Sequence, residues 1–133
     1  WLTSDIPWEF YFVHYEETWP TDEDQWEFLS ERSPLTYAAD ARTPLLLGGG
    51  TADPRVHPSQ PHMLYRAVEA STDTPVRYVQ YPGEGHGNGV STHRYDYMLR
   101  ALRWFDHYLR PGNHRSDAPP PMDLDYGAWL GGR

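Results

Sequence analysis

The fold is decided by the stretch TPLLLGGG at residues 43–50, in which three leucines stand between a proline and three glycines. A short, fully apolar run that glycines stop is typical of a strand buried in a parallel sheet. With 133 residues, the chain is long enough for at most one hydrophobic core. We therefore expect a strand at 45–47 within a single domain or a part of one.

Three further patterns follow this strand along the chain. Residues 58–70 place apolar side chains at helical spacing after a proline, whose missing N–H group costs little in a first turn. Residues 75–81 alternate apolar and polar side chains before a Pro-Gly turn, which indicates a second strand. Residues 92–109 repeat apolar side chains at i, i+3, i+4 and i+7, which predicts the longest helix. The order of strand, helix, strand and helix is typical of parallel strands joined by crossover helices, so the predicted fold class is α/β.

The two ends of the chain carry different signals. Residues 1–19 are dense in aromatic side chains without a regular period, which suggests an irregular segment packed on an apolar surface. Residues 21–24 supply an N-cap and first-turn acids for a short helix that ends near residues 32–34. Residues 113–133 are rich in proline and glycine, which predicts an extended surface tail. The expected division is a folded part at 1–112 followed by this tail.

Composition argues against several classes of partner. The formal net charge is −8, from 11 basic and 19 acidic residues, so we expect no nucleic acid partner. No apolar run approaches the roughly 18 to 20 residues that a membrane-spanning helix needs, so no membrane partner is expected. The absence of cysteine excludes disulfides and thiolate metal sites, and leaves both a cytoplasmic and an exported location open.

Catalytic residue types stand in the loops that follow the two predicted strands. The first loop is GTADPRV at residues 50–56, and the second is PGEGHGN at residues 82–88. Reactive groups in open α/β sheets collect at the carboxyl ends of the strands, so we expect Asp53 and His86 to touch. Alone, an Asp-Pro pair is an ordinary turn and a histidine among glycines is more often a surface residue. Together they are stronger evidence, because an acid followed by a histidine is the order of these residues in α/β-hydrolases.

Longer stretches around both loops carry a family resemblance. Residues 43–56 resemble the acid-loop motif of the prolyl oligopeptidase family, T-P-x-L-x-x-H-G-x-x-D-x-R-V, and YPGEGHG at 81–87 resembles its histidine loop. RSPL at 32–35 fits as well, and WFDHYL at 104–109 resembles the closing helix of that family. The likeness covers about Ser4 to Leu109 and is closest to the acylaminoacyl peptidase and dipeptidyl peptidase-like branch.

This resemblance implies a serine peptidase that hydrolyses short peptides by acyl transfer, with this chain as the C-terminal portion of an α/β-hydrolase fold. On that basis His86 is expected to accept the serine proton, and Asp53 to orient and stabilise the histidine ring. The resemblance also implies that Arg55 hydrogen-bonds a substrate carbonyl. The other substrate-binding candidates are Val56, Phe10 and Tyr11, the last two as part of the pocket for the side chain before the cleaved bond.

Two features depart from the family pattern. Gly49 stands where the family commonly has a histidine before the acid loop. None of the serines stands in a Gly-x-Ser-x-Gly motif, so the resemblance implies a nucleophile upstream of Trp1, with a β-propeller domain further upstream. The expected partners are a peptide substrate and this upstream part of the same protein, while a homo-oligomer stays open. On this interpretation the chain is a fragment that cannot catalyse alone.

A second interpretation is a noncatalytic α/β-hydrolase relative, a binding or scaffold module whose upstream nucleophile is lost. The other histidines suggest no further chemistry. His57 and His62 lie five residues apart, which does not place two ligands squarely on one helical face, and no carboxylate completes a set. We expect neither a metal nor a cofactor, and expect surface positions for His93, His107 and His114.

Overall fold

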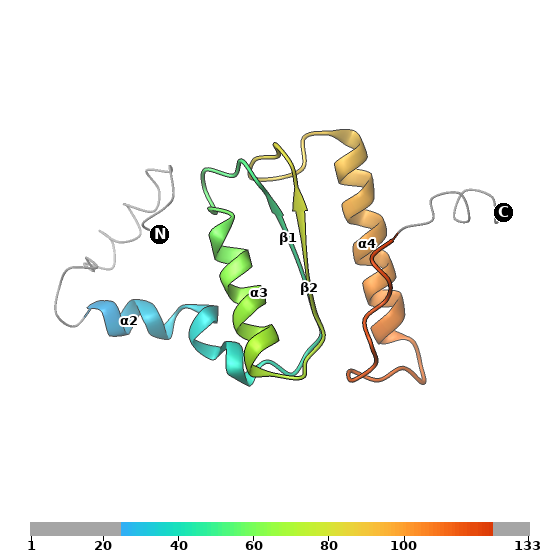
Figure 1. Ribbon diagram of the computed structural model, residues 1–133, viewed down its shortest axis with the longest axis horizontal. Coiled ribbons are helices and arrows are strands. Elements are labelled where there is room, and N and C mark those ends of the chain that lie inside the picture. Colours follow the sequence, from blue (N-terminus) through green and yellow to red (C-terminus); the bar gives the residue numbers. More distant parts are fainter. Residues whose placement is uncertain (1–24, 124–133) are drawn as a thin grey trace.

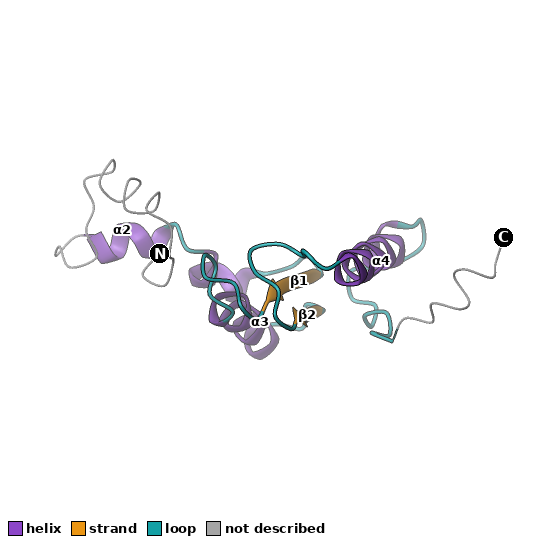
Figure 2. Ribbon diagram, turned by 90° about the horizontal axis from the view of Figure 1, so that it is seen from above, coloured by secondary structure: helices purple, strands orange, loops and turns teal. Residues whose placement is uncertain are grey.

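The computed structural model describes residues 25–123, and its centre is a parallel pair of strands, β1 (Leu45–Gly50) and β2 (Val76–Tyr81). Helix α3 (Ser59–Ser71) connects the strands, and helix α4 (Ser91–Leu109) follows the second strand. The two helices lie on opposite sides of the strand pair (Figure 1), as the view from above also shows (Figure 2). The predicted α/β order of strand, helix, strand and helix is confirmed.

Strand β1 is longer than the sequence predicts. The expectation that the glycines at 48–50 stop the strand is wrong, because all three pair with residues 79–81 of β2. A Cβ atom built on Gly50 would lie 2.2 Å from the carbonyl oxygen of Glu84, in the loop after β2. Glycine is therefore required here because another backbone approaches closely, and its presence does not mark the end of the strand.

Helix α3 holds the strand pair from one side. Val68, near the end of the helix, is 1% exposed and packs with Val76 of β2 and with Ala38. Leu45 of β1 packs against the same cluster. Pro58 occupies the position just before the helix, which agrees to within one residue with the predicted start. The core of the described chain thus lies between α3, the strands and the segment before β1.

The segment before β1 contains two short helices. Helix α2 (Gln25–Glu31) belongs to the helix expected after residue 21, and a 3₁₀ helix, η1 (Pro34–Asp40), follows it. The sequence analysis did not predict η1, because a 3₁₀ turn of this length has no apolar repeat that marks it. The Tyr37 hydroxyl donates to the carbonyl oxygen of Glu31 at 2.6 Å and so joins the two helices. The aromatic stretch at 1–19 lies outside the described residues.

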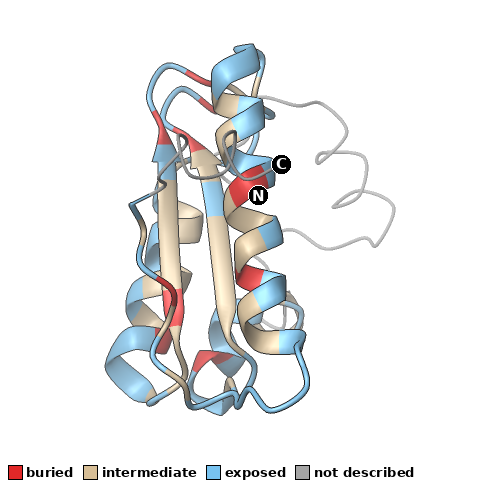
Figure 3. Ribbon diagram, turned by 90° about the vertical axis from the view of Figure 1, so that its right-hand side faces the viewer, coloured by how far each residue is buried: buried red, intermediate tan, exposed pale blue. Residues whose placement is uncertain are grey.

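Helix α4 buries only part of its apolar surface. Leu99 and Trp104 are buried against the rest of the chain, and Figure 3 shows how few such positions the helix has. Six of its large apolar side chains are exposed, by 43% to 74%: Tyr95, Tyr97, Met98, Leu102, Phe105 and Leu109. None of the described helices is both long and apolar enough to cross a membrane.

The residues after α4 run back along this helix. Arg100 donates to the carbonyl oxygen of Met122 at 2.7 Å, and the Tyr108 hydroxyl donates to that of Asp117 at 3.2 Å. Pro120 is buried. The described start of the predicted tail, up to residue 123, is thus an extended segment that α4 anchors to its surface (Figure 1).

Candidate active site

The turn after β1 buries Asp53 and surrounds it with hydrogen-bond donors. Asp53 is 8% exposed, and its Oδ1 accepts hydrogen bonds from the backbone N–H groups of Arg55 at 2.9 Å and Val56 at 3.0 Å. Burial raises the pKa of the carboxyl group, but the Val56 and Arg55 bonds and the His86 ring outweigh burial and lower that pKa below the ordinary value of 3.8. Asp53 is therefore ionised at neutral pH.

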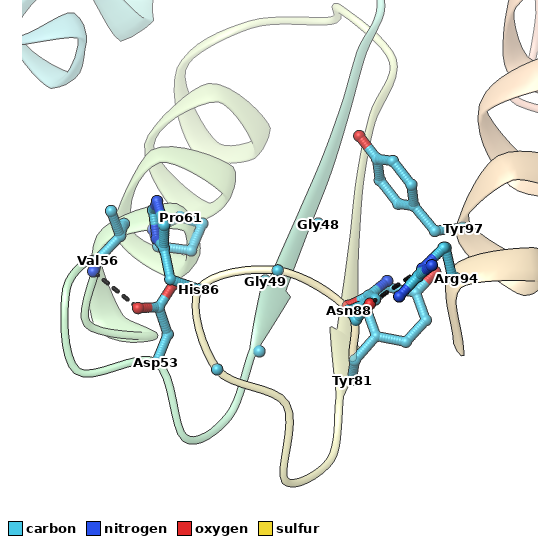
Figure 4. A pocket seen from close by; sticks show the side chains of 13 residues that line it. Gly48, Gly49, Asp53, Val56, Pro61, Tyr81, His86, Asn88, Arg94 and Tyr97 are labelled. Carbon is cyan, nitrogen blue, oxygen red and sulfur yellow. Dashed lines mark hydrogen bonds and ion pairs between the residues drawn. The ribbon is translucent and has the colours of Figure 1, made fainter. Parts of the chain in front are cut away.

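The loop after β2 brings His86 to this carboxylate. The ring Nδ1 lies 3.1 Å from Asp53 Oδ2, so the contact expected from the two loops is present (Figure 4). The His86 side chain is 50% exposed and that of Asp53 is 9% exposed, which places the ring between a buried acid and solvent. Because Nδ1 is engaged by the carboxylate, Nε2 is the ring nitrogen left to exchange a proton with a reactant.

A cavity of about 570 Å³ adjoins the pair. The glycines at 48–50 line it, together with residues of the loops and of both helices. Val56 and Pro61 lie on one side of these glycines, and Tyr97 and Arg94 of α4 lie on the other (Figure 4). The pair of Asp53 and His86 thus faces a space with one wall from each flanking helix.

The predicted substrate-binding residues have different positions. Val56 lines the cavity. Arg55 is exposed, its backbone N–H group binds Asp53, and the part of the cavity wall formed by described residues does not include it. Phe10 and Tyr11 lie outside the described residues. The structure therefore brings Asp53, His86 and Val56 together around one cavity, and Arg55 lies outside the described part of its wall.

Glu84 and His93 form a second pair of an acid and a histidine. Glu84 is 5% exposed, and its Oε1 lies 2.7 Å from Nδ1 of His93 in the first turn of α4. The expectation of a surface position for His93 is wrong, because this bond holds the ring and leaves 32% of the side chain exposed. His107 is also half-buried, whereas His114 is exposed as expected. In the sequence, the feature that could have pointed to Glu84 is that it is the single acid of its loop and stands two residues before His86.

Tyr81 connects the cavity to helix α4. It is 4% exposed, and its hydroxyl donates to Oδ2 of Asp96 at 2.9 Å, an oxygen that Arg100 also binds at 2.6 Å. Burial, followed by the bond to Asp96, raises the pKa of the Tyr81 hydroxyl, which stays a neutral donor. The wall that α4 forms is therefore fixed to the end of β2.

Chemically, the arrangement can move a proton. An ionised carboxylate that binds one ring nitrogen increases the ability of the other nitrogen to accept a proton from a hydroxyl group. Within residues 25–123, no three histidine, aspartate or glutamate side chains are grouped as a metal site would require.

Comparison with known proteins identifies the family. The model of the prolyl oligopeptidase family matches residues 1–112. Dipeptidyl aminopeptidase BIII of Pseudoxanthomonas mexicana is 46% identical over 61 residues, 46% of this chain and 9% of that protein. Acylamino-acid-releasing enzyme of Rattus norvegicus is 32% identical over 95 residues, 71% of this chain and 13% of that protein. Dipeptidyl peptidase family member 6 of Caenorhabditis elegans is 30% identical over 105 residues, 74% of this chain and 14% of that protein.

The chain thus spans about a tenth to a seventh of the length of these relatives. Since the family match covers most of its residues, the chain belongs to the prolyl oligopeptidase family.

Proposed function

We propose that this chain supplies the acid and the base of a serine peptidase that hydrolyses short peptides by acyl transfer. The observation that carries the proposal is the 3.1 Å contact between His86 Nδ1 and Asp53 Oδ2, at the carboxyl ends of neighbouring parallel strands. Membership of the prolyl oligopeptidase family and similarity to proteins named as peptidases support it. On this proposal the chain is the C-terminal portion of an α/β-hydrolase fold, and polypeptide upstream of Trp1 provides the serine.

The proposed mechanism uses His86 twice. Its Nε2 accepts the serine proton while the serine oxygen bonds to the substrate carbonyl carbon and the carbonyl oxygen becomes negatively charged. The C–N bond then breaks, and His86 returns the proton to the leaving amine. Water repeats the sequence on the acyl-enzyme, which releases the acid product and restores the serine hydroxyl. Asp53 accepts the Nδ1–H hydrogen bond throughout and stabilises the imidazolium.

The substrate peptide lies in the cavity beside this pair. Val56 contacts it from the cavity wall. Arg55, which is exposed two residues after Asp53, donates to a substrate carbonyl in this proposal. Phe10 and Tyr11 contribute to the pocket for the side chain before the cleaved bond.

Labelling of the full-length protein with a fluorophosphonate tests the proposal, because this reagent modifies a serine that a neighbouring base activates. We expect the wild-type protein to be labelled on one serine upstream of Trp1. His86→Ala and Asp53→Asn should each lower the labelling rate by roughly 10⁴-fold, since the first removes the base and the second no longer holds it in the reactive tautomer.

His114→Ala is the matched control, because His114 is exposed and lies far along the chain from both loops. It should be labelled at the wild-type rate. A wild-type protein that is folded but not labelled contradicts the proposal and favours a noncatalytic binding module. Undiminished labelling of His86→Ala would mean that another residue is the base.

A further inference from the structure

The loop between β2 and α4 contains a carboxylate that the proposed mechanism does not use. Glu84 accepts hydrogen bonds from the backbone N–H groups of Gly89 at 2.6 Å and Val90 at 2.9 Å, and from Nδ1 of His93 at 2.7 Å. The Gly89 and Val90 bonds and the His93 ring lower the pKa of Glu84 below the ordinary carboxyl value of 4.5, although burial opposes this. A buried, ionised side chain that accepts three hydrogen bonds has little freedom to move, so it holds its part of the loop in place.

These donors lie at the start of helix α4. Val90 is the residue that caps this helix, and its own side chain makes no capping hydrogen bond. Glu84 binds the backbone N–H groups of Val90 and of Gly89 before it, at the helix N-terminus, where negative charge is favourable. The carboxylate therefore fastens the loop to α4.

The backbone of Glu84 fastens the same loop to the acid loop. Its carbonyl oxygen accepts the N–H of Ala52 at 2.9 Å, and it approaches Gly50 so closely that no Cβ atom fits there. Asp53 follows Ala52 directly. One residue thus links the loop of the acid, the loop of the base and the helix that forms the far wall of the cavity.

Beside His86 itself there is one short backbone bond, from the N–H of Gly87 to the carbonyl oxygen of Gly85 at 2.8 Å. His86 stands between Gly85 and Gly87, and Gly87 has a φ of 128°, a conformation that residues with side chains avoid. Glycines on both sides give the loop backbone freedom, so contacts beyond this one bond help to determine where the ring lies. The nearest anchor before it is Glu84, separated from His86 only by Gly85.

We infer that Glu84 is a positioning residue for His86: it binds His93 and the N-terminus of α4, and so holds the imidazole within hydrogen-bond distance of Asp53. This inference rests on the proposed function. Glu84 touches neither substrate nor serine, and acts only by fixing the loop.

Fluorophosphonate inactivation of the full-length protein, measured over a range of reagent concentrations, tests the inference. Glu84→Gln keeps the size of the side chain, but it removes the charge and points an amide NH₂ group at donors. We expect the maximal inactivation rate to fall about 100-fold, as a displacement of about 1 Å can produce, with the half-saturating concentration unchanged. A merely structural role would lower the melting temperature but leave the rate of the folded protein unchanged.

Glu69→Gln is the matched control, because Glu69 is an exposed glutamate on α3 that pairs with Arg66. It should inactivate at the wild-type rate. If folded Glu84→Gln is also inactivated at the wild-type rate, the inference is wrong.

If Glu84→Gln does not fold, His93→Ala tests the inference instead, since it leaves both backbone bonds to Glu84 intact. A rate lowered by about tenfold, as expected for one lost charged hydrogen bond, supports the inference. An unchanged rate overturns it.

The wild-type protein and His86→Ala separate the two proposals. If the wild type is not labelled, the proposed function fails and this inference fails with it. If labelling depends on His86 while Glu84→Gln reacts like the wild type, only the positioning role of Glu84 is refuted.

Discussion

At the scale of single residues, Gly50 decides how closely the acid loop and the histidine loop approach each other. It is buried at the end of β1, and the carbonyl oxygens of Glu84 and Gly85 lie 2.2 Å and 2.5 Å from where its Cβ atom would be. Both neighbours are backbone atoms, which do not move aside as a flexible side chain does. The proximity of the acid loop and the histidine loop therefore depends on this residue having no side chain.

Gly50→Ala should destabilise the folded protein and separate the pair. We expect a loss of about 3 kcal/mol in the free energy of unfolding, the upper part of the range for overpacked sites, and slower fluorophosphonate labelling. Denaturant unfolding measures the first effect. Gly85→Ala is the control, because no atom lies within 4 Å of its Cβ position and its φ is not positive. Equal stability of the two variants would show that β1 and the loop can move apart without cost.

The same scale shows what the sequence does and does not predict about the site. Asp53 and His86 could be predicted, because each follows its own strand directly and the carboxyl ends of parallel strands lie together. The bond between Glu84 and His93 could not, because it forms only when the loop folds back on the first turn of α4. No pattern in the sequence reports that His93 will contact Glu84.

At the scale of elements, periodicity predicts what is local. The bounds of α3, β2 and α4 lie within about one residue of the ranges that apolar spacing indicates, since the spacing follows from the geometry of helix and strand. The length of β1 could not be predicted from its own residues. Its last three residues are glycines, and only the nearby residues of the loop after β2 and of α4, such as Tyr97 beside Gly48, explain why a strand continues through them.

Helix α4 and the segment that follows it yield an element-scale prediction. The Arg100 guanidinium donates to the carbonyl oxygen of Met122, and loss of a charged hydrogen bond costs about 1.5 to 3 kcal/mol. Arg100→Ala should therefore release the segment and speed trypsin cleavage after the exposed Arg115 by about tenfold. The fragments can be followed by mass spectrometry.

Arg110→Ala provides the comparison, because Arg110 binds Asp106 on the exposed surface of the same helix. Cleavage after Arg115 should proceed at the wild-type rate in this variant. If Arg100→Ala is also cut no faster than the wild type, the segment does not depend on Arg100 for its place along α4.

At the scale of the whole molecule, the described part of the chain has more exposed than buried large hydrophobic side chains. Six hydrophobic residues are buried there, Ala38, Val68, Val76, Tyr81, Leu99 and Trp104. Twelve large hydrophobic side chains are exposed, six of them on α4 between Tyr95 and Leu109. Within residues 25–123, strand β1 pairs only with β2, and sheets of two strands are marginal on their own. These surfaces favour further polypeptide packed against the sheet and α4, as the proposed upstream half requires.

This balance predicts how residues 1–133 behave when they are produced alone. The small core should not support a cooperative unfolding transition, and the exposed apolar side chains should bind the dye 8-anilinonaphthalene-1-sulfonate with a several-fold rise in fluorescence. The full-length protein should unfold cooperatively and should not bind the dye, because its upstream part covers the same side chains. Calorimetry and dye titration of the two proteins measure the difference. A sharp, two-state transition of residues 1–133 without dye binding would mean that the described elements form a complete core, and the case for an upstream half that completes the sheet would lose its physical basis.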